Sequence, residues 1–266
     1  MTCTLSTLMT GKLSTLIVGD GNFSFACALV RLGKLPHPPC ELTATSYDSK
    51  ETLIEKYGHR AARNVEVLEM EGCRVMCGVD ATNLSASFSP ERTFDTIIFQ
   101  HPLIDRNDRY VKAQAGEMSA KEDYIIANRL LILDFLLSAK QLLQEPDGEI
   151  KVTVKQVHPY TLWRVARLQE YAGGLVLKRV EAFKNKDYPG KNFYKVCLGQ
   201  FYWKLTTALR HQNSAGYETM NVEMNHAFPS ETATTFIFGL PQSSCGVEQL
   251  DIGTISQVPR GKVCVG

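Results

Sequence analysis

The sequence lacks an excess of charge of either sign. It has 29 Lys and Arg residues against 28 Asp and Glu residues, for a formal net charge of +1. This balance excludes the overall basic field that many nucleic-acid-binding proteins carry, so any contact with nucleic acid must come from local clusters of basic residues. With 266 residues, of which 44% are hydrophobic, the chain can build the core of one large domain or two small ones.

Metal-binding and membrane-spanning patterns are also missing. The eight cysteines include no C-x-x-C pair, and Cys73 and Cys77 have no Cys or His partners at zinc spacing. We expect reduced, mostly buried thiols and no metal. No apolar run approaches the roughly 20 residues of a membrane span, and no signal-peptide pattern opens the chain. We expect an intracellular protein that does not contact a membrane, although residues 1–12 are compatible with a short organellar presequence.

The most informative stretch is a strand, a glycine turn and a helix in direct succession. The apolar run Leu16-Ile17-Val18 breaks into Gly19-Asp20-Gly21-Asn22-Phe23, and small and apolar residues follow from Ser24. Glycines permit a sharp turn and a close approach to a ligand, and the free N–H groups of the helix start would point at that ligand. Ser24 stands where the dinucleotide fingerprint has its third glycine, so a plain glycine turn is the alternative.

The next two predicted strands both end on an acid. Residues 41–48 end on Tyr47-Asp48, and residues 73–80 end on Asp80, which Ala81 follows. Parallel strands in a doubly wound sheet bring their carboxyl ends to one edge, where ligands bind. An acid at such a strand end typically binds ribose hydroxyls, so Asp48 is a candidate ribose ligand. The alternative is that Asp48 caps the helix that starts at Ser49.

A fourth strand, residues 94–99, runs into the polar corner Gln100-His101-Pro102. A turn histidine without a chemical role is the alternative reading of His101. The charged loop 105–112 and the segment 184–193, where cations alternate with aromatics, are candidate RNA contacts or plain solvated loops.

The remaining elements build the rest of the sheet and its cover. A long helix is predicted with Ile126, Leu130, Leu133 and Leu137 as its core side. A fifth strand, residues 150–155, has Lys151 and Lys155 on one face, and a helix follows over residues 162–171. Further strands are predicted at residues 193–203 and 234–238.

Taken together, these segments resemble the large-subunit ribosomal RNA uridine-N3 methyltransferases with the BMT5-like domain, from about Leu13 to Phe201. The resemblance rests on residues 18–25, 43–49, 78–82, 94–99, 128–129, 148–155, 159–160, 163 and 188–190, in that order. This family commonly continues its fourth strand with Asn-Phe-Pro-His and glycines, whereas this chain has Gln100-His101-Pro102-Leu103.

The resemblance implies an α/β fold of the Rossmann-like class I methyltransferase type, with a mostly parallel sheet and helices on both faces. We expect this domain over residues 1–204 and an extension of uncertain structure over residues 205–266. The implied cofactor is S-adenosylmethionine, and the implied catalytic corner is Gln100, His101 and Pro102, with His101 as the candidate proton acceptor. The implied cofactor-binding residues are Gly19, Asp20, Gly21, Asn22, Phe23, Ser24, Tyr47, Asp48, Ser49, Asp80 and Ala81.

The implied reaction is methylation of ribosomal RNA, most simply at uridine N3, on free RNA or on a pre-ribosomal particle. The extension is a candidate site for a protein partner. The expected compartment is the nucleus, nucleolus or cytoplasm, with the mitochondrion as the alternative. A catalytically degenerate ribosome-assembly factor on the same scaffold is the competing interpretation, and a nicotinamide enzyme is a third, which fits the turn spacing poorly.

Overall fold

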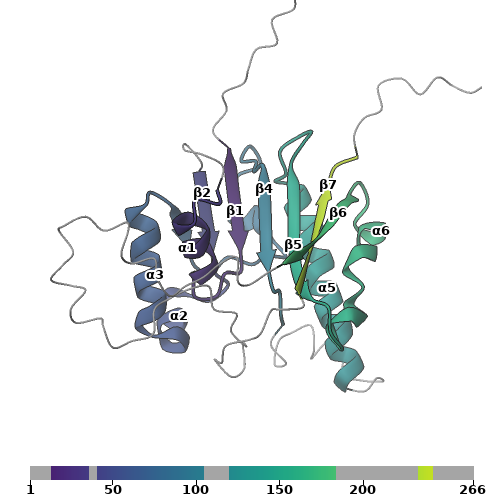
Figure 1. Ribbon diagram of the computed structural model, residues 1–266, viewed down its shortest axis with the longest axis horizontal. Helices are drawn as coiled ribbons and strands as arrows, with labels where there is room; N and C mark the ends of the chain where they lie inside the picture. The colour runs from purple at the N-terminus through teal and green to yellow at the C-terminus, as the bar shows by residue number, and fades with distance from the viewer. Residues whose placement is uncertain (1–12, 36–40, 105–119, 184–232, 242–266) are drawn as a thin grey trace, which may run out of the picture.

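The computed structural model describes residues 13–35, 41–104, 120–183 and 233–241. These residues form a seven-stranded sheet with helices on both faces (Figure 1), in the order β3-β2-β1-β4-β5-β7-β6. The strands are β1 (Ser14–Val18), β2 (Glu41–Thr45), β3 (Arg74–Met76), β4 (Thr96–Gln100), β5 (Glu149–Lys155), β6 (Val176–Phe183) and β7 (Ala233–Gly239). The helices are α1 (Ser24–Arg31), α2 (Lys50–Tyr57), α3 (His59–Met70), α5 (Ala120–Lys140) and α6 (Gln169–Ala172).

Five neighbouring strands, β3, β2, β1, β4 and β5, are parallel, and β7 lies antiparallel between β5 and β6. The predicted mostly parallel α/β sheet of the class I type is therefore confirmed. The strand predicted at residues 234–238 is also confirmed as β7. Thus one strand from the predicted extension is an inner member of the sheet.

The sheet is held by two apolar layers, one on each face. One layer joins α1, α2 and α3 to the sheet through Phe25, Leu53 and Leu68, and the other joins α5 and the post-β5 segment through Phe135 and Trp163. Every residue of β1 is buried because helices cover both faces of this central strand. Parallel strands therefore deliver their carboxyl ends together to one edge, where the polar candidates lie.

Two predicted elements differ from the observed ones. The helix predicted over residues 162–171 is instead a series of short turns, η2 (Tyr160–Trp163), η3 (Val165–Arg167) and α6. Arg164 has a left-handed φ of 49°, which interrupts helical hydrogen bonding between the first two turns. The third strand is shorter than predicted and ends at Met76, because Gly78 turns the chain at a φ of 73°.

The long helix α5 is confirmed, but its predicted core side is wrong. The buried residues of α5 include Ile132, Phe135, Leu136 and Ala139, whereas Leu137 is 37% exposed. Apolar residues occur on most sides of this helix, so their spacing does not select one face. The strand predicted at residues 193–203 and the charged loops at 105–112 and 184–193 lie outside the described residues.

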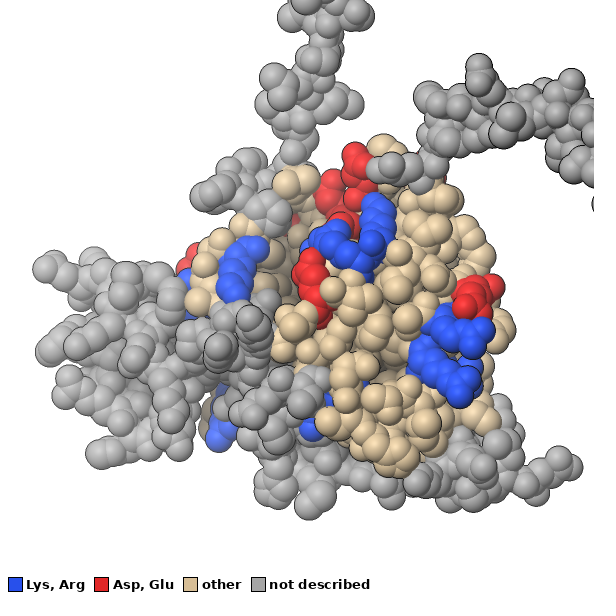
Figure 2. All heavy atoms as spheres, turned by 45° about the vertical axis from the view of Figure 1, so that its right-hand side comes forward, with Lys and Arg blue, Asp and Glu red and all other residues tan. Residues whose placement is uncertain are grey.

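Ion pairing explains how the charge balance is arranged on the surface. Arg179 pairs with Glu149 and Glu181, and Arg167 pairs with Glu170. Figure 2 shows basic and acidic side chains gathered together on the face that it presents. The described part of this face therefore carries mixed charge, as the balanced composition leads one to expect.

Candidate active site

Two aromatic side chains leave no room for a Cβ atom at either glycine of the turn after β1. Gly19 has a φ of 64°, and a Cβ atom there would lie 2.7 Å from the ring of Phe99 on β4. A Cβ atom on Gly21 would lie 2.8 Å from the hydroxyl of Tyr57 on α2. The two glycines thus make room for the protein's own side chains.

The amide groups at the start of α1 are already satisfied inside the protein. The carboxylate of Asp20 accepts from the backbone N–H groups of Phe25, at 3.4 Å, and Ala26, at 2.7 Å. The amide oxygen of Asn22 accepts from the N–H of Ser24 at 3.1 Å. The prediction that these N–H groups point at a ligand is therefore wrong, because side chains of the turn have taken the place of an anion.

This arrangement bears on the class of ligand. A dinucleotide of the Rossmann type places its pyrophosphate at the start of the first helix. Here that position holds the buried carboxylate of Asp20, which would repel a phosphate. Burial also raises the pKa of Asp20 to about 6, so the carboxyl group is mostly ionised at neutral pH. The structure therefore disfavours the nicotinamide interpretation.

Asp48 lies just beyond β2, and its carboxylate accepts a hydrogen bond from the ammonium of Lys56 at 2.7 Å. Its side chain is only 13% exposed. The cap of α2 is Ser49, whose hydroxyl accepts from the N–H of Thr52, so the alternative that Asp48 caps this helix is wrong. The hydroxyl of Ser49 is engaged in that cap, and the neighbouring Tyr47 is 63% exposed.

Backbone hydrogen bonds join the three predicted strand ends. The N–H of Asp20 donates to the carbonyl of Thr45, and the N–H of Gly78 donates to that of Asp48. Asp80, in the loop after β3, turns its carboxylate toward Thr82, accepting from the backbone N–H and the hydroxyl, while Ala81 is buried. The fold thus brings the predicted strand ends together at one edge, with the glycine turn, Asp48 and Asp80 in the loops that follow them.

Tyr57 is a neighbour of this edge that the sequence did not single out as functional. Its hydroxyl faces Gly21, and burial together with the charges of Asp48 and Asp20 raises its pKa to about 12. From the sequence, residues 51–71 are expected to be a polar, helix-like stretch, and Tyr57 is predicted only as part of its buried side. No local motif marks it, because its contact with the turn spans 36 residues of chain.

The corner after β4 carries a buried amide with an unused donor. Gln100 is 8% exposed, and its Nε2 makes no hydrogen bond to any described residue. Buried polar groups in proteins are nearly always satisfied, so this amide is a candidate ligand contact. Pro102, the last residue of the corner, is buried, and the N–H of Ile104 donates to the side-chain carbonyl of Asn128 on α5. Asn128 thereby fixes the path of the chain as it leaves the corner.

His101 is held in place by backbone and ring contacts. It has a left-handed φ of 52°, its N–H donates to the carbonyl of Thr153 at 2.9 Å, and its ring meets that of Phe183 edge-on at 5.8 Å. Burial, with a smaller effect of the charge on Lys155, lowers its pKa to about 4. The imidazole is therefore neutral at pH 7, but such a low pKa makes it a weak proton acceptor.

The lowered pKa of His101 predicts a loss of stability in acid. The unfolded chain binds a proton at His101 near pH 6.5 and the folded chain only near pH 4, so stability falls as the pH drops between these values. From pH 7.5 to 5 we expect His101 to cost about 2 kcal/mol. His101→Asn, which tolerates the left-handed backbone, should abolish this term. Urea denaturation of both proteins at both pH values measures it, and equal losses for the two would contradict it.

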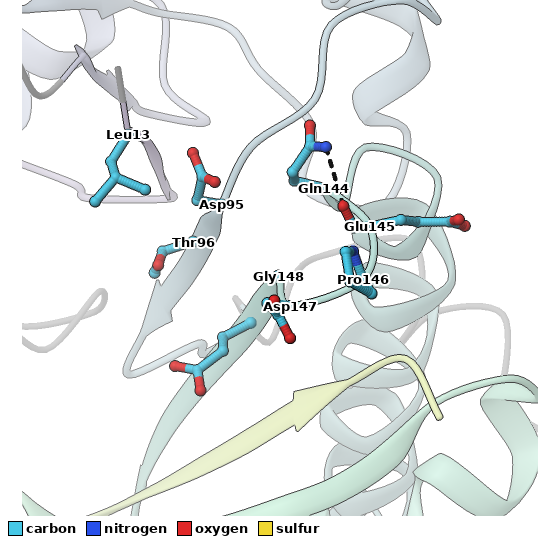
Figure 3. A pocket seen from close by; sticks show the side chains of 9 residues that line it. Leu13, Asp95, Thr96, Gln144, Glu145, Pro146, Asp147 and Gly148 are labelled. Atoms are coloured by element: carbon cyan, nitrogen blue, oxygen red, sulfur yellow. Dashed lines mark hydrogen bonds between the residues drawn. The ribbon is translucent and has the colours of Figure 1, made fainter. Parts of the chain in front are cut away.

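A separate pocket of about 320 Å³ lies at the opposite edge of the sheet. Thr96 and Glu149, the first residues of β4 and β5, line it together with Leu13, Asp95 and residues 144–148 (Figure 3). It is therefore remote from the carboxyl ends of the strands.

Among the described residues no three or more His, Cys, Asp or Glu side chains are grouped as metal ligands would be. None of the described helices is long and apolar enough to cross a bilayer.

One family model, several curated proteins and several solved structures are similar to this chain. Residues 16–195 match the family described as BMT5-like, rRNA (uridine-N3-)-methyltransferase BTM5-like. An uncharacterised protein of Arabidopsis thaliana is 34% identical over 178 residues, which is 66% of this chain and 78% of that protein. Human ferredoxin-fold anticodon-binding domain-containing protein 1 is 32% identical over 196 residues, which is 69% of this chain but only 27% of that protein. Among solved structures, an rRNA methylase from Streptococcus thermophilus superposes with a TM-score of 0.40 at 9% identity, covering 87% of this chain and 89% of that one.

Proposed function

Because the chain belongs to the BMT5-like family of rRNA (uridine-N3-)-methyltransferases, we propose that it transfers a methyl group from S-adenosylmethionine to N3 of a uridine in ribosomal RNA. The observation that carries the proposal is the carboxyl edge of the sheet. This edge carries acidic side chains from the loops after β1, β2 and β3, and a buried, unsatisfied amide at the end of β4. The acids suit the cofactor and the amide suits a base.

The acidic edge fits the chemistry of S-adenosylmethionine. This cofactor has ribose hydroxyls, an ammonium group and a sulfonium cation, and it has no phosphate. The Asp48 carboxylate, already in contact with one ammonium group, can accept hydrogen bonds from ribose hydroxyls. The ionised Asp20 keeps the glycine turn negative, which favours a cation nearby and excludes a pyrophosphate.

The corner after β4 fits the base. In a parallel α/β sheet the neighbouring strand ends share one crevice, so a base at Gln100 lies next to a cofactor at the glycine turn. The Nε2 of Gln100 can donate to a carbonyl oxygen of uracil, and the rings of His101 and Phe183 form an apolar wall beside it. A target base must leave its stack to enter such a site.

The cofactor supplies a methyl group bound to a sulfonium sulfur. Because that centre is already activated, the protein's residues have to hold the base in line with it and favour the base form that has lost its N3 proton. Gln100 orients the base through a carbonyl oxygen. The ring of His101 and the buried ring of Phe183 form a wall that would exclude water from the acceptor.

The proposal is tested by the product. The purified protein should methylate large-subunit ribosomal RNA with labelled S-adenosylmethionine, and nucleoside analysis should give 3-methyluridine.

Asp48→Ala should weaken cofactor binding 10- to 150-fold in a calorimetric titration if its carboxylate binds the ribose, because charge-assisted hydrogen bonds of this kind contribute about 1.5 to 3 kcal/mol.

Ser49→Ala serves as the matched control in that titration. The resemblance implies Ser49 as a cofactor-binding residue, but its hydroxyl is already engaged by Glu51 and by the N–H of Thr52. The substitution removes the cap of α2 and leaves the Asp48 carboxylate in place, so we expect a small loss of stability with little change in cofactor affinity. A protein that binds the cofactor and rRNA but forms no methylated nucleoside would support the scaffold interpretation instead.

A further inference from the structure

The ends of β4, β5, β6 and β7 place three side chains on one face of the sheet. Lys155 on β5 and Phe183 on β6 are both paired with Ala233 of β7, from opposite sides. Gln100 on β4 is aligned with Thr153, two residues before Lys155. Because aligned residues point to the same face and side chains alternate along a strand, Gln100, Lys155 and Phe183 share the face that α1 covers.

The surroundings of Lys155 concentrate its charge near this corner. Its ammonium lies 5.7 Å from the centre of the Tyr160 ring, a distance typical of a cation–π contact. Two titratable groups of the described residues lie near it, the Tyr160 phenol and the His101 imidazole. Because burial keeps that imidazole neutral, it neither cancels nor competes with the ammonium at neutral pH.

We propose that Lys155 is a catalytic residue that, together with the Gln100 amide, stabilises the anionic form of the target base through its carbonyl oxygens. This inference rests on the proposed function and deepens it, because it names the substrate as an N–H flanked by two carbonyl groups. No sequence motif gives Lys155 a functional role, and the segment from Lys155 to Trp163 has no part in the function proposed so far. The unsatisfied and nine-tenths buried amide of Gln100 is the second, independent observation.

Methylation at N3 is favoured by a positive charge close to the base. Loss of the N3 proton of uracil to water leaves a negative charge shared by N3 and the two flanking oxygens. The N3 lone pair then forms a bond to the methyl carbon, the carbon–sulfur bond breaks, and its electron pair stays on sulfur as the thioether. A fixed ammonium and an amide N–H beside the oxygens lower the energy of the anion, as donors in an oxyanion hole do. Neutral His101, with its low pKa, contributes little as a base.

The first test is the pH dependence of methylation by the full chain. Lys155→Gln should slow the reaction 10- to 100-fold at pH 7, and the gap should narrow as the pH rises and the base ionises without help. Lys155→Arg keeps the positive charge and should restore most of the rate. Lys151→Gln is the matched control, because Lys151 lies on the same face of β5 near the other end of the strand, where it pairs with Glu149 at 3.2 Å.

The second test measures how the charge of Lys155 affects the ionisation of a bound base in the absence of the cofactor. The ¹⁹F shift of a short RNA that contains 5-fluorouridine follows the ionisation of its N3 proton. Bound wild-type protein and Lys151→Gln should move this ionisation to lower pH, whereas bound Lys155→Gln should leave it near that of the free RNA. Circular dichroism of each variant establishes that it is folded.

The outcomes separate the two proposals. If wild-type protein makes 3-methyluridine and Lys155→Gln matches it in rate at every pH, the role of Lys155 is overturned. The role of Lys155 is also overturned if the ¹⁹F titration curves of the RNA bound to wild type and to Lys155→Gln are the same. If no uridine is methylated but the ¹⁹F ionisation moves only when Lys155 is present, the proposed reaction fails and the anion-stabilising site stands.

Discussion

Asp20→Ala is expected to lower the free energy of unfolding by about 3 kcal/mol at pH 7.5. The substitution leaves the N–H groups of Phe25 and Ala26 buried without an acceptor, and each unsatisfied buried donor costs about 1–3 kcal/mol. Removal of a buried charge offsets part of this loss. Urea denaturation followed by circular dichroism measures the difference.

A second helix cap in the same chain provides the matched control. Ser49 caps α2 at the exposed surface, where water can replace its hydroxyl, so Ser49→Ala should cost only about 1 kcal/mol. Asp20→Asn keeps one side-chain acceptor and should lie between wild type and Asp20→Ala. Equal costs for Asp20→Ala and Ser49→Ala would show that the buried carboxylate does not hold the start of α1.

The raised pKa of Asp20 adds a pH signature to this prediction. The folded protein binds the proton near pH 6 and the unfolded chain near pH 3.8, so the stability that this residue contributes increases as the pH falls between these values. Between pH 7.5 and 5, the gap between wild type and Asp20→Ala should widen by about 1 kcal/mol. The sign is opposite to that for His101, and a gap that narrows in acid would contradict it.

Gly19→Ala is expected to cost about 3 kcal/mol, through two separate causes. A φ of 64° strains any residue with a Cβ atom by about 1 to 2 kcal/mol. The added Cβ would also lie 2.7 Å from the Phe99 ring, which is packed against Phe135 and has to shift, at a further cost of about 1 to 3 kcal/mol. Urea denaturation again gives the difference in stability.

Gly33→Ala separates these two causes. Gly33 has a similar φ of 56°, and a Cβ there would meet nothing within 4 Å, so only the strain should remain. In a double-mutant cycle, Phe99→Leu should cost less in the Gly19→Ala background than in wild type, because it removes the ring atoms that the new methyl group meets. Additive costs, or equal costs for the two glycines, would exclude the contact with Phe99.

The sequence alone determined the fold class and the order of the polar strand ends. Short apolar strands, a glycine turn before a helix and acids at residues 48 and 80 are local patterns, and the rule that parallel strands end at one edge brings them together. Gly58 likewise marks the break between α2 and α3, because a φ of 59° ends the first helix. Such features follow from the conformational preferences of a few neighbouring residues, which the sequence displays directly.

Only the tertiary structure decided which groups are available for chemistry. Whether the N–H groups of α1 face a ligand depends on where the Asp20 carboxylate turns, and which side of α5 is buried depends on the sheet it meets. The insertion of β7 between β5 and β6 gives Lys155 and Phe183 a common partner in Ala233, 78 residues after Lys155. These outcomes depend on long-range packing and on the hydrogen-bond partners it brings together, so no local pattern in the sequence contains them.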